Sequence, residues 1–367
     1  MNLSILARYL LRRFFLTFFV SIACFILIFN LVNLVENIGK YVESGAKATD
    51  IALYYFYFTP FIVVLTCPIA TLLAAIFSIG LLAKTNELTA MKAAGISIYR
   101  IAVVLMTGGL VIAGGLWIFG EMVLPEANYQ KNIIKTERIE RRKSESASVY
   151  RNQMFQGLDG RIFQFGNYVS KSATGEDVLI QTFEGRALRQ IITADKLEWR
   201  DSIWVGTNVG WKEIGDLDTA AQPIITITHD SLAFPQFRER PNFFEDWFTR
   251  QDAYSMDYFK LKRFIAVSRS LGKNVKSQLV DLYNKTSFPL INVIIILIGV
   301  ALASNPRRAG LGISFGLSMG ISFVFFTMVK IAIEMGHNGI ISPILAAWGT
   351  NVVFLLLGLI LLIRVPK

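Results

Sequence analysis

Stretches without charged side chains set the architecture of this chain. A helix needs about 20 apolar residues to cross the hydrocarbon core of a bilayer. Six stretches of about that length or longer contain no Asp, Glu, Lys or Arg, and these are 14–35, 51–83, 101–120, 286–306, 309–329 and 338–363. No such stretch occurs between 125 and 285, so the pattern predicts three membrane spans, a polar insert of about 160 residues and three further spans.

The first two apolar stretches have special features. The second exceeds the length of one span, so we expect it to include an interfacial turn and to be kinked by Pro60 and Pro68. The first follows several arginines and precedes Ala46-Lys47-Ala48, which resembles a signal-peptide cleavage site. Its apolar run is longer than the roughly 7–15 residues of a signal peptide, so we predict a retained span.

The insert predicts an outward helix and then an antiparallel β-domain. Residues 126–146 are charged and compatible with a helix that continues the third span. From residue 149 the apolar pattern has the period of a strand, with one strand at 161–165 after the turn dipeptide Asp159-Gly160. Further strand candidates are 178–183, 187–193, 196–200, 203–206, 209–214 and 224–228. Short strands at this spacing are typical of a sandwich or jelly roll, whose exposed edges can pair with another chain.

After the strands, the apolar pattern returns to a helical period. The residues on one face are Tyr258, Leu261, Phe264, Ile265 and Ser268, with Lys260, Lys262 and Arg263 between them. Gly272 is placed to end this helix, and a second short helix at 276–285 leads into the fourth span. Both helices fit either the membrane surface or packing against the insert.

The predicted fold is therefore an α-helical membrane protein with six transmembrane helices (3+3) and an inserted all-β, jelly-roll-like domain. The predicted boundaries are 1–125 for the first three spans, 126–255 for the β-domain, 256–285 for the surface helices and 286–367 for the last three spans.

Composition agrees with a membrane protein and excludes several kinds of site. Hydrophobic residues make up 53% of the chain and charged residues 17%, against about 25% in soluble domains. Cys24 and Cys67 both lie in apolar runs, which excludes a disulfide framework and a cysteine-rich metal site. His229 and His337 are too few for a histidine-rich metal site. The sequence has no P-loop motif, so we expect no ATP site of its own, no cofactor and no catalytic residues.

The net charge of +10 becomes a marker of sidedness once the spans are placed, and no longer suggests a nucleic-acid partner. With the N-terminus inside, the cytoplasmic segments hold one acid, Glu87, and the basic residues Arg8, Arg12, Arg13, Lys84, Lys92, Arg100, Arg307, Arg308, Arg364 and Lys367. The outward ends hold Lys40, Lys47 and Lys330 against Glu36, Glu43, Asp50, Glu121 and Glu334. We therefore expect both termini in the cytoplasm and the insert outside.

The loop between the second and third spans predicts a short amphipathic helix at 85–95. Thr85 or Asn86 can cap it, and Glu87 lies in the first turn, where the helix dipole favours an anion. Its apolar face consists of Leu88, Met91 and Ala94, and Gly95 follows as the stop. Such a helix either enters a groove on a partner or lies on the lipid surface.

Several segments resemble the lipopolysaccharide-export permease family, whose members are the paired membrane subunits LptF and LptG. The similar segments are NELTAMKAAGIS in the loop, ARYLLRRFFLTF at the start, SLGKNV and LYNKTSFP before the fourth span, NPRRAG after it and AAWGTNVVFLLLGLILLIR at the end. The resemblance covers nearly the whole chain, and the loop is its most specific part. The end of the last span is nearer to the LptG side of the family.

The resemblance implies a non-catalytic permease subunit of the bacterial inner membrane. Its implied partners are lipopolysaccharide, a cytoplasmic ATPase dimer (LptB-like), a second similar permease subunit and a periplasmic β-domain bridge protein (LptC/LptA-like). The loop would be the coupling helix, and the residues implied at the ATPase contact are Glu87, Leu88, Met91, Lys92 and Gly95. The resemblance also implies a salt bridge from Glu87 to an ATPase arginine. As the lone acid on a basic face, Glu87 has no intrachain partner evident in the sequence, and a neutral capping role is the alternative.

The outward lysines Lys40, Lys330 and Lys47 are candidates for lipid binding, because cations there could meet the phosphates of a lipid head group. The resemblance also implies that the first and fifth spans line a lipid cavity. The alternatives are an i,i+4 pair of Glu36 with Lys40, a similar pair of Lys330 with Glu334, or simple snorkelling to the interface.

Span five also carries glycines, which permit close approach of another helix. They are Gly310, Gly312, Gly316 and Gly320.

Two functions of other classes compete with a permease subunit. One is a membrane-anchored sensor or scaffold whose outer β-domain binds a ligand. The other is a secondary transporter, which the lack of inward-facing acidic side chains within the spans disfavours. Purification together with a P-loop ATPase distinguishes the permease subunit from a scaffold.

Overall fold

The computed structural model describes residues 3–139, 149–157, 161–184, 187–214, 225–241, 244, 253–270, 274–304 and 311–364. The chain forms two compact units. A helical unit holds residues Met1–Ile134, Ala253–Ile265 and Lys273–Lys367, and a β unit holds Lys135–Asp252 and Ala266–Gly272.

Six helices of the described residues are long and apolar enough to cross a membrane. They are α1 (Leu3–Ser44), α2 (Ala48–Lys84), α4 (Ile98–Met122), α8 (Lys276–Ala303), α9 (Leu311–His337) and α10 (Pro343–Ile363). Each contains one of the six predicted stretches, apart from a few terminal residues. The predicted fold class, six membrane helices with a β-domain inserted between the third and the fourth, is confirmed. Arg307, Arg308, Gly310 and Lys367 lie outside the described residues.

Two local predictions about the spans are wrong. Residues 51–83 contain no turn, because α2 runs unbroken through Pro60 and Pro68. The expected separate helix at 276–285 is instead the first part of α8, which continues through Pro289. In each case a helix interior tolerates proline because the apolar side chains around it stay packed: Pro68 and Pro289 are both buried.

Polar side chains join the spans to one another. The Thr71 hydroxyl donates to Asn292 Oδ1 at 2.8 Å, and Asn351 Nδ2 donates to the Ser287 carbonyl oxygen at 2.7 Å, both in buried positions. Between α1 and α2, the Tyr55 hydroxyl donates to Asn33 Oδ1 at 3.1 Å. Because lipid offers no hydrogen-bond partners, such bonds fix which helices pair.

Short helices continue the spans. Beyond α4, helix α5 (Leu124–Ile133) and a π-helical segment (Ile134–Ile139) extend the predicted outward helix to residue 139, with a break at Val123 before Pro125.

After a short 3-10 turn (Ala253–Ser255), α7 (Tyr258–Ser270) has the predicted amphipathic faces. Leu261 and Ile265 are buried against the start of α8, so part of this face is covered within the helical unit. Both the membrane-surface role and packing against the insert stay predictions. The expected stop at Gly272 lies outside the described residues.

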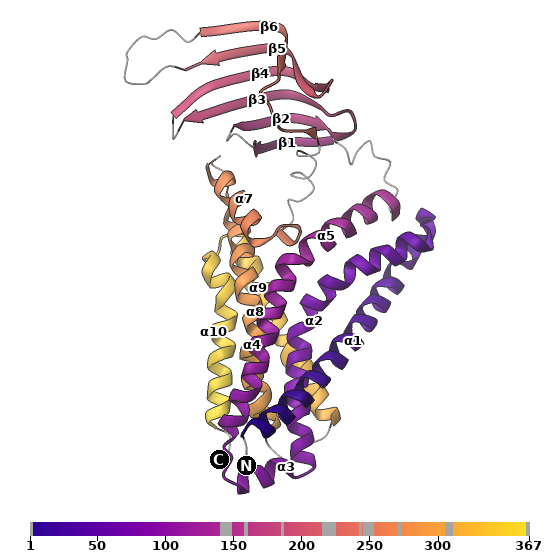
Figure 1. Ribbon diagram of the computed structural model, residues 1–367, viewed down its shortest axis with the longest axis vertical. Coiled ribbons are helices and arrows are strands. Elements are labelled where there is room, and N and C mark those ends of the chain that lie inside the picture. Colours follow the sequence, from indigo (N-terminus) through magenta and orange to yellow (C-terminus); the bar gives the residue numbers. More distant parts are fainter. Residues whose placement is uncertain are drawn as a thin grey trace. The chain divides into compact units, whose positions relative to one another are not determined.

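The β unit is a single antiparallel sheet of six described strands in sequence order. They are β1 (Val149–Gln156), β2 (Ile162–Val169), β3 (Thr174–Glu184), β4 (Ala187–Arg200), β5 (Ile203–Glu213) and β6 (Ile225–Phe234), shown in Figure 1. The two-sheet order of a sandwich or jelly roll is not seen among these strands, because each one pairs with its neighbour in sequence. The dipeptide Asp159-Gly160, expected at the first turn, lies outside the described residues.

In two places one continuous strand replaces two predicted ones. Residues 187–193 and 196–200 form one strand, β4, and residues 203–206 and 209–213 form another, β5. The interruption in the apolar pattern marks a local irregularity of pairing, where Asn208 has a positive φ of 52° and its Nδ2 donates to Asp195 Oδ2 at 2.7 Å. A polar link across the irregularity keeps both strands continuous.

Aromatic side chains fill one face of the sheet. The fully buried rings are those of Phe155, Phe163, Phe165, Tyr168, Trp204, Phe234 and Phe244. Phe244 packs edge-on against Phe155, with ring centroids 4.5 Å apart. The insert therefore has a core of its own.

Glycine at position 109 allows α4 to approach α8. A Cβ atom there would lie 2.4 Å from Ile296 Cδ1 and 3.1 Å from the Asn292 carbonyl oxygen, whereas nothing lies within 4 Å of a Cβ at Gly115 on the same helix. We expect Gly109→Ala to destabilise the purified protein by about 1–3 kcal/mol through overpacking. Gly115→Ala, the matched control, should be neutral or stabilising because alanine favours helix. Thermal unfolding in detergent, followed by tryptophan fluorescence, measures both; equal midpoints would contradict the predicted packing.

Candidate functional site

The predicted loop helix is present as α3 (Glu87–Ala93), and it begins without the predicted cap. Asn86, at the cap position, has a left-handed backbone (φ 58°) and its side chain makes no capping hydrogen bond. The Thr85 hydroxyl lies 3.0 Å from the Leu81 carbonyl oxygen, at the end of α2, and 2.9 Å from Glu87 Oε1, and its single hydrogen is shared between these two acceptors. Capping by Thr85 or Asn86 is therefore wrong, because both residues serve the sharp turn from α2 into α3.

The end of α3 follows the prediction. Gly95 has a φ of +80°, and its N–H donates to the Lys92 carbonyl oxygen at 2.9 Å. The next N–H, of Ile96, donates to the Met91 carbonyl oxygen at 3.0 Å. This pair of bonds is the Schellman motif, which favours glycine at the left-handed position. Gly95 is thus the structural stop of the helix.

Glu87 has three partners within its own chain, so the expectation that it has none is wrong. The Tyr9 hydroxyl donates to Oε2 at 2.8 Å, and the Thr85 hydroxyl donates to Oε1 at 2.9 Å. Arg13 Nη2 lies 3.6 Å from Oε1, and its guanidinium covers the Tyr9 ring at 4.4 Å from the centroid. Tyr9 and Arg13 come from the first turns of α1, so the carboxylate joins α1 to α3.

These contacts keep the carboxylate ionised. The hydrogen bond from Tyr9 is the largest cause that lowers the pKa of Glu87, and Thr85 and Arg13 lower it further against the opposing effect of burial. A lowered pKa means that the charge, and the stability it contributes, is present at neutral pH and is lost only as the pH falls below the ordinary range of a glutamate.

The predicted apolar face of α3 is largely turned toward its own chain. Leu88 is only 3% exposed, inside the cluster that also holds Leu10 and Phe14 of α1, and Met91 packs against that cluster. Among the predicted face residues only Ala94 is exposed, and Lys92 is half-buried. A groove of about 460 Å³ remains open between α1 and α3, lined by Ile5, Leu6, Tyr9, Glu87, Ala90, Met91 and Ala94.

The structure separates the three outward lysines. Lys40 Nζ donates to Asn37 Oδ1 at 3.5 Å on α1, and among the described residues it makes no ion pair with Glu36. Lys47 is exposed just before α2. Lys330 is exposed on α9 and, within the described part of the chain, forms no ion pair with Glu334. The two i,i+4 pairs, which were the alternatives to lipid binding, are therefore absent from the described residues.

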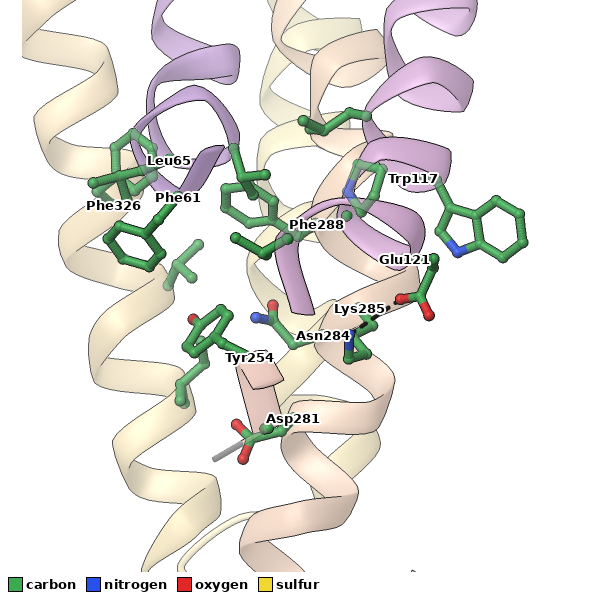
Figure 2. A pocket seen from close by; sticks show the side chains of 18 of the residues that line it. Phe61, Leu65, Trp117, Glu121, Tyr254, Asp281, Asn284, Lys285, Phe288 and Phe326 are labelled. Carbon is green, nitrogen blue, oxygen red and sulfur yellow. Dashed lines mark hydrogen bonds and ion pairs between the residues drawn. The ribbon is translucent and has the colours of Figure 1, made fainter. Parts of the chain in front are cut away.

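Of these three lysines, Lys330 lines a described pocket of the helical unit. This pocket of about 130 Å³ lies between α2, α4, α8 and α9. The rings of Phe61, Tyr254 and Phe326 lie on one side of it, and Glu121 and Lys285 lie on the other (Figure 2). The lining is apolar with a few charged groups, which is the character of a site for an amphiphile.

The Glu121–Lys285 pair at this pocket was missed in the sequence. Lys285 Nζ lies 3.1 Å from Glu121 Oε1, and the side chains are only 13% and 14% exposed. The other carboxylate oxygen accepts from the backbone N–H of Tyr258, at the start of α7. One carboxylate therefore joins α4, α7 and α8. The only signal in the sequence was an acid and a base, each bordering an apolar stretch.

Three glycines of span five, Gly312, Gly316 and Gly320, are open within the part of the chain that the structure describes. A Cβ atom at any of them would meet nothing within 4 Å. The approach of another helix to this face stays a prediction.

Six candidate membrane helices among the described residues, a β-sheet insert after the third and a short polar-anchored helix between the second and third define the class: a multi-pass membrane protein built in two halves around an insert. The chain belongs to the family described as lipopolysaccharide export system permease LptF/LptG, whose model matches residues 8–364. The lipopolysaccharide export system permease protein LptG of Escherichia coli (strain K12) is 21% identical over 380 residues, covering 98% of each chain. The protein of the same name from Escherichia coli O6:H1 (strain CFT073) shows the same identity and coverage.

The buried ion pair at the pocket predicts a difference between two lysines. Lys285→Met should destabilise the protein by on the order of 3 kcal/mol, because it leaves the Glu121 charge buried and unpaired. Lys330→Met removes an exposed lysine from the same pocket and should change stability by less than about 0.5 kcal/mol. Thermal unfolding in detergent compares them. Similar midpoints for the two variants would show that the Glu121–Lys285 pair is not the stabilising element assigned to it.

Proposed function

We propose that this chain is the permease subunit of an ATP-driven extractor that moves lipopolysaccharide from the outer leaflet of the bacterial inner membrane to a periplasmic bridge. The observation that carries the proposal is an ionised, preorganised Glu87 on a short helix at one end of a six-helix membrane unit. Membership of the LptF/LptG permease family supplies the substrate class. ATP hydrolysis is assigned to a partner.

The proposed topology places both termini and α3 in the cytoplasm and the β unit in the periplasm. The start of α1, the end of α10 and α3 lie at one end of the helical unit (Figure 1), which is consistent with an even number of crossings. The described basic residues of that end are Arg8, Arg12, Arg13, Lys84, Lys92, Arg100 and Arg364, with Glu87 as the described acid. This excess is typical of the cytoplasmic side.

The proposed ATPase contact lies on the exposed side of α3 itself. An ionised carboxylate offers about four acceptor positions; hydrogen bonds from Tyr9 and Thr85 use two of them, and Arg13 lies at the longer ion-pair distance of 3.6 Å. Acceptor capacity is left for a donor such as an arginine of the ATPase. Leu88 holds the helix in place, while Glu87, Met91 and the exposed alanines offer the docking surface; Lys92 and Gly95 complete the proposed site.

The proposed lipid path follows the faces of α1 and α9. In each of these helices only 17% of the most apolar window is buried, so both present apolar surface to lipid or to a second, similar subunit. Lys330 at its pocket, and Lys40 and Lys47 at the ends of α1 and α2, are the proposed contacts for head-group phosphates. A cavity between the two subunits would close and expel the lipid.

The β unit is proposed to receive the acyl chains. Its interior, filled by buried aromatic side chains, is the proposed apolar shelter, and the described edge strands β1 and β6 each have one side without a paired strand in the sheet. An edge of this kind can continue into the β-domain of a periplasmic bridge protein by strand addition.

Neutralising Glu87 tests the proposed ATPase contact. Glu87→Gln keeps an oxygen that accepts from Tyr9 but removes the charge, so the fold should persist while the amount of ATPase purified with the chain falls about tenfold, as for loss of a charge-assisted hydrogen bond. Glu334→Gln, an exposed acid on α9, is the matched control. Undiminished ATPase in the Glu87→Gln complex would refute the contact. A wild-type chain that brings down no ATPase would favour a membrane-anchored sensor or scaffold.

Charge reversal tests the lipid contacts. Lys330→Glu and Lys40→Glu should each lower photocrosslinking to lipopolysaccharide several-fold, because a carboxylate repels the head-group phosphates. Lys262→Glu, at an exposed position on α7, should leave crosslinking unchanged. Crosslinking that is the same in all three variants would remove both lysines from the proposed path.

A further inference from the structure

The Tyr9–Glu87 hydrogen bond has a consequence beyond docking. The chain itself connects α3 directly to α2 and to α4, through short turns at 85–86 and 94–97. The chain makes no such direct connection between α3 and α1, because Tyr9 of α1 and Glu87 of α3 are 78 residues apart in the sequence. The contacts with Glu87 and the burial of Leu88 are what join α3 to the first span.

The α1 side of this junction is itself well anchored. Tyr9 and Arg13 are one turn apart, and the guanidinium covers the ring. Next to them, Leu10 and Phe14 are 1% and 0% exposed in the same apolar cluster as Leu88. The polar contact and the apolar contact therefore act on the same turns of α1, so a displacement of α3 reaches α1 without an intervening flexible segment.

The part of α1 that lies beyond its junction with α3 is exposed over much of its surface. The helix is continuous over 42 residues and has no proline, so it is a rod about 63 Å long. From Leu27 to Val42 many of its large apolar side chains are exposed, with Leu27 71% and Val42 75% exposed. By contrast, α2 contains two prolines, each of which removes a backbone hydrogen bond from the helix.

We propose that Tyr9 is a positioning residue that fastens α3 to α1, so that movement of α3 driven by the ATPase displaces the first span as a single body. This inference rests on the proposed ATPase contact of α3. Arg13 supports Tyr9 by covering its ring and by holding the carboxylate, at the longer distance of 3.6 Å.

The chain carries a natural reporter on α1. Cys24 is exposed and Cys67, the other cysteine, is buried. Within this chain a spin label therefore goes to Cys24; subtracting the electron paramagnetic resonance spectrum of a Cys24→Ser complex labelled in the same way removes the signal of partner cysteines, and the difference reports on α1. In the wild type we expect the spectrum to change when the ATPase is trapped with ATP and vanadate.

Tyr9→Phe removes only the hydroxyl and keeps the ring, Arg13 and the charge on Glu87. We expect this variant to purify with normal amounts of ATPase, to lose most of the spectral change at Cys24, and to release about tenfold less lipopolysaccharide per ATP hydrolysed. Arg13→Gln should show a smaller loss. The matched control is Tyr99→Phe on α4, whose hydroxyl makes no hydrogen bond among the described residues.

The outcomes separate this inference from the proposed function. If the wild-type chain brings down no ATPase, the proposed function fails and this inference fails with it. If Tyr9→Phe keeps the ATPase, the spectral change and the coupling of the wild type, only the link through Tyr9 is overturned. Loss of the ATPase from Tyr9→Phe would also overturn it, because Tyr9 would then support docking rather than transmission.

Discussion

The helical unit depends on one apolar cluster in which α1, α2, α3, α4 and α8 meet. Leu88 of α3 and Phe14 of α1 are buried in it, together with Ile101 of α4 and Ile295 of α8. A seven-residue helix is too short to be stable by itself, so burial of Leu88 is what keeps α3 folded at the end of the spans. Because α3 is held in this way, the Glu87 carboxylate points in a fixed direction.

Inside the spans, the few polar groups act as specific joints. Lipid provides no competing water, so the Thr71–Asn292 bond and the Glu121–Lys285 pair each link helices that are far apart in the sequence. Both joints fix α8, the first against α2 and the second against α4 and α7. Along the most apolar parts of α1 and α9 many large apolar side chains remain exposed, which suits contact with lipid or another helix.

The features that could be predicted from the sequence are those set by neighbouring residues along the chain. The bilayer sets the length of the spans, and period-two alternation marks the strands, so both were found without a structure. The stop at Gly95 follows from local backbone geometry in the same way. The order of the strands was not predictable, because the alternation that marks a strand does not specify its neighbour. The partners of Glu87 and Glu121 were missed for a related reason: Tyr9 is 78 residues from Glu87, and Lys285 is 164 residues from Glu121. Only the packing of the helices brings these groups together.

The most direct test of a permease subunit driven by a separate ATPase is the ATPase activity of the complex purified with this chain, reconstituted in lipid vesicles with and without lipopolysaccharide. We expect a P-loop ATPase in the complex, and we expect lipopolysaccharide to stimulate its activity more than an equal amount of phospholipid does. Activity that does not respond to lipopolysaccharide, or a complex without an ATPase, would contradict the proposed function.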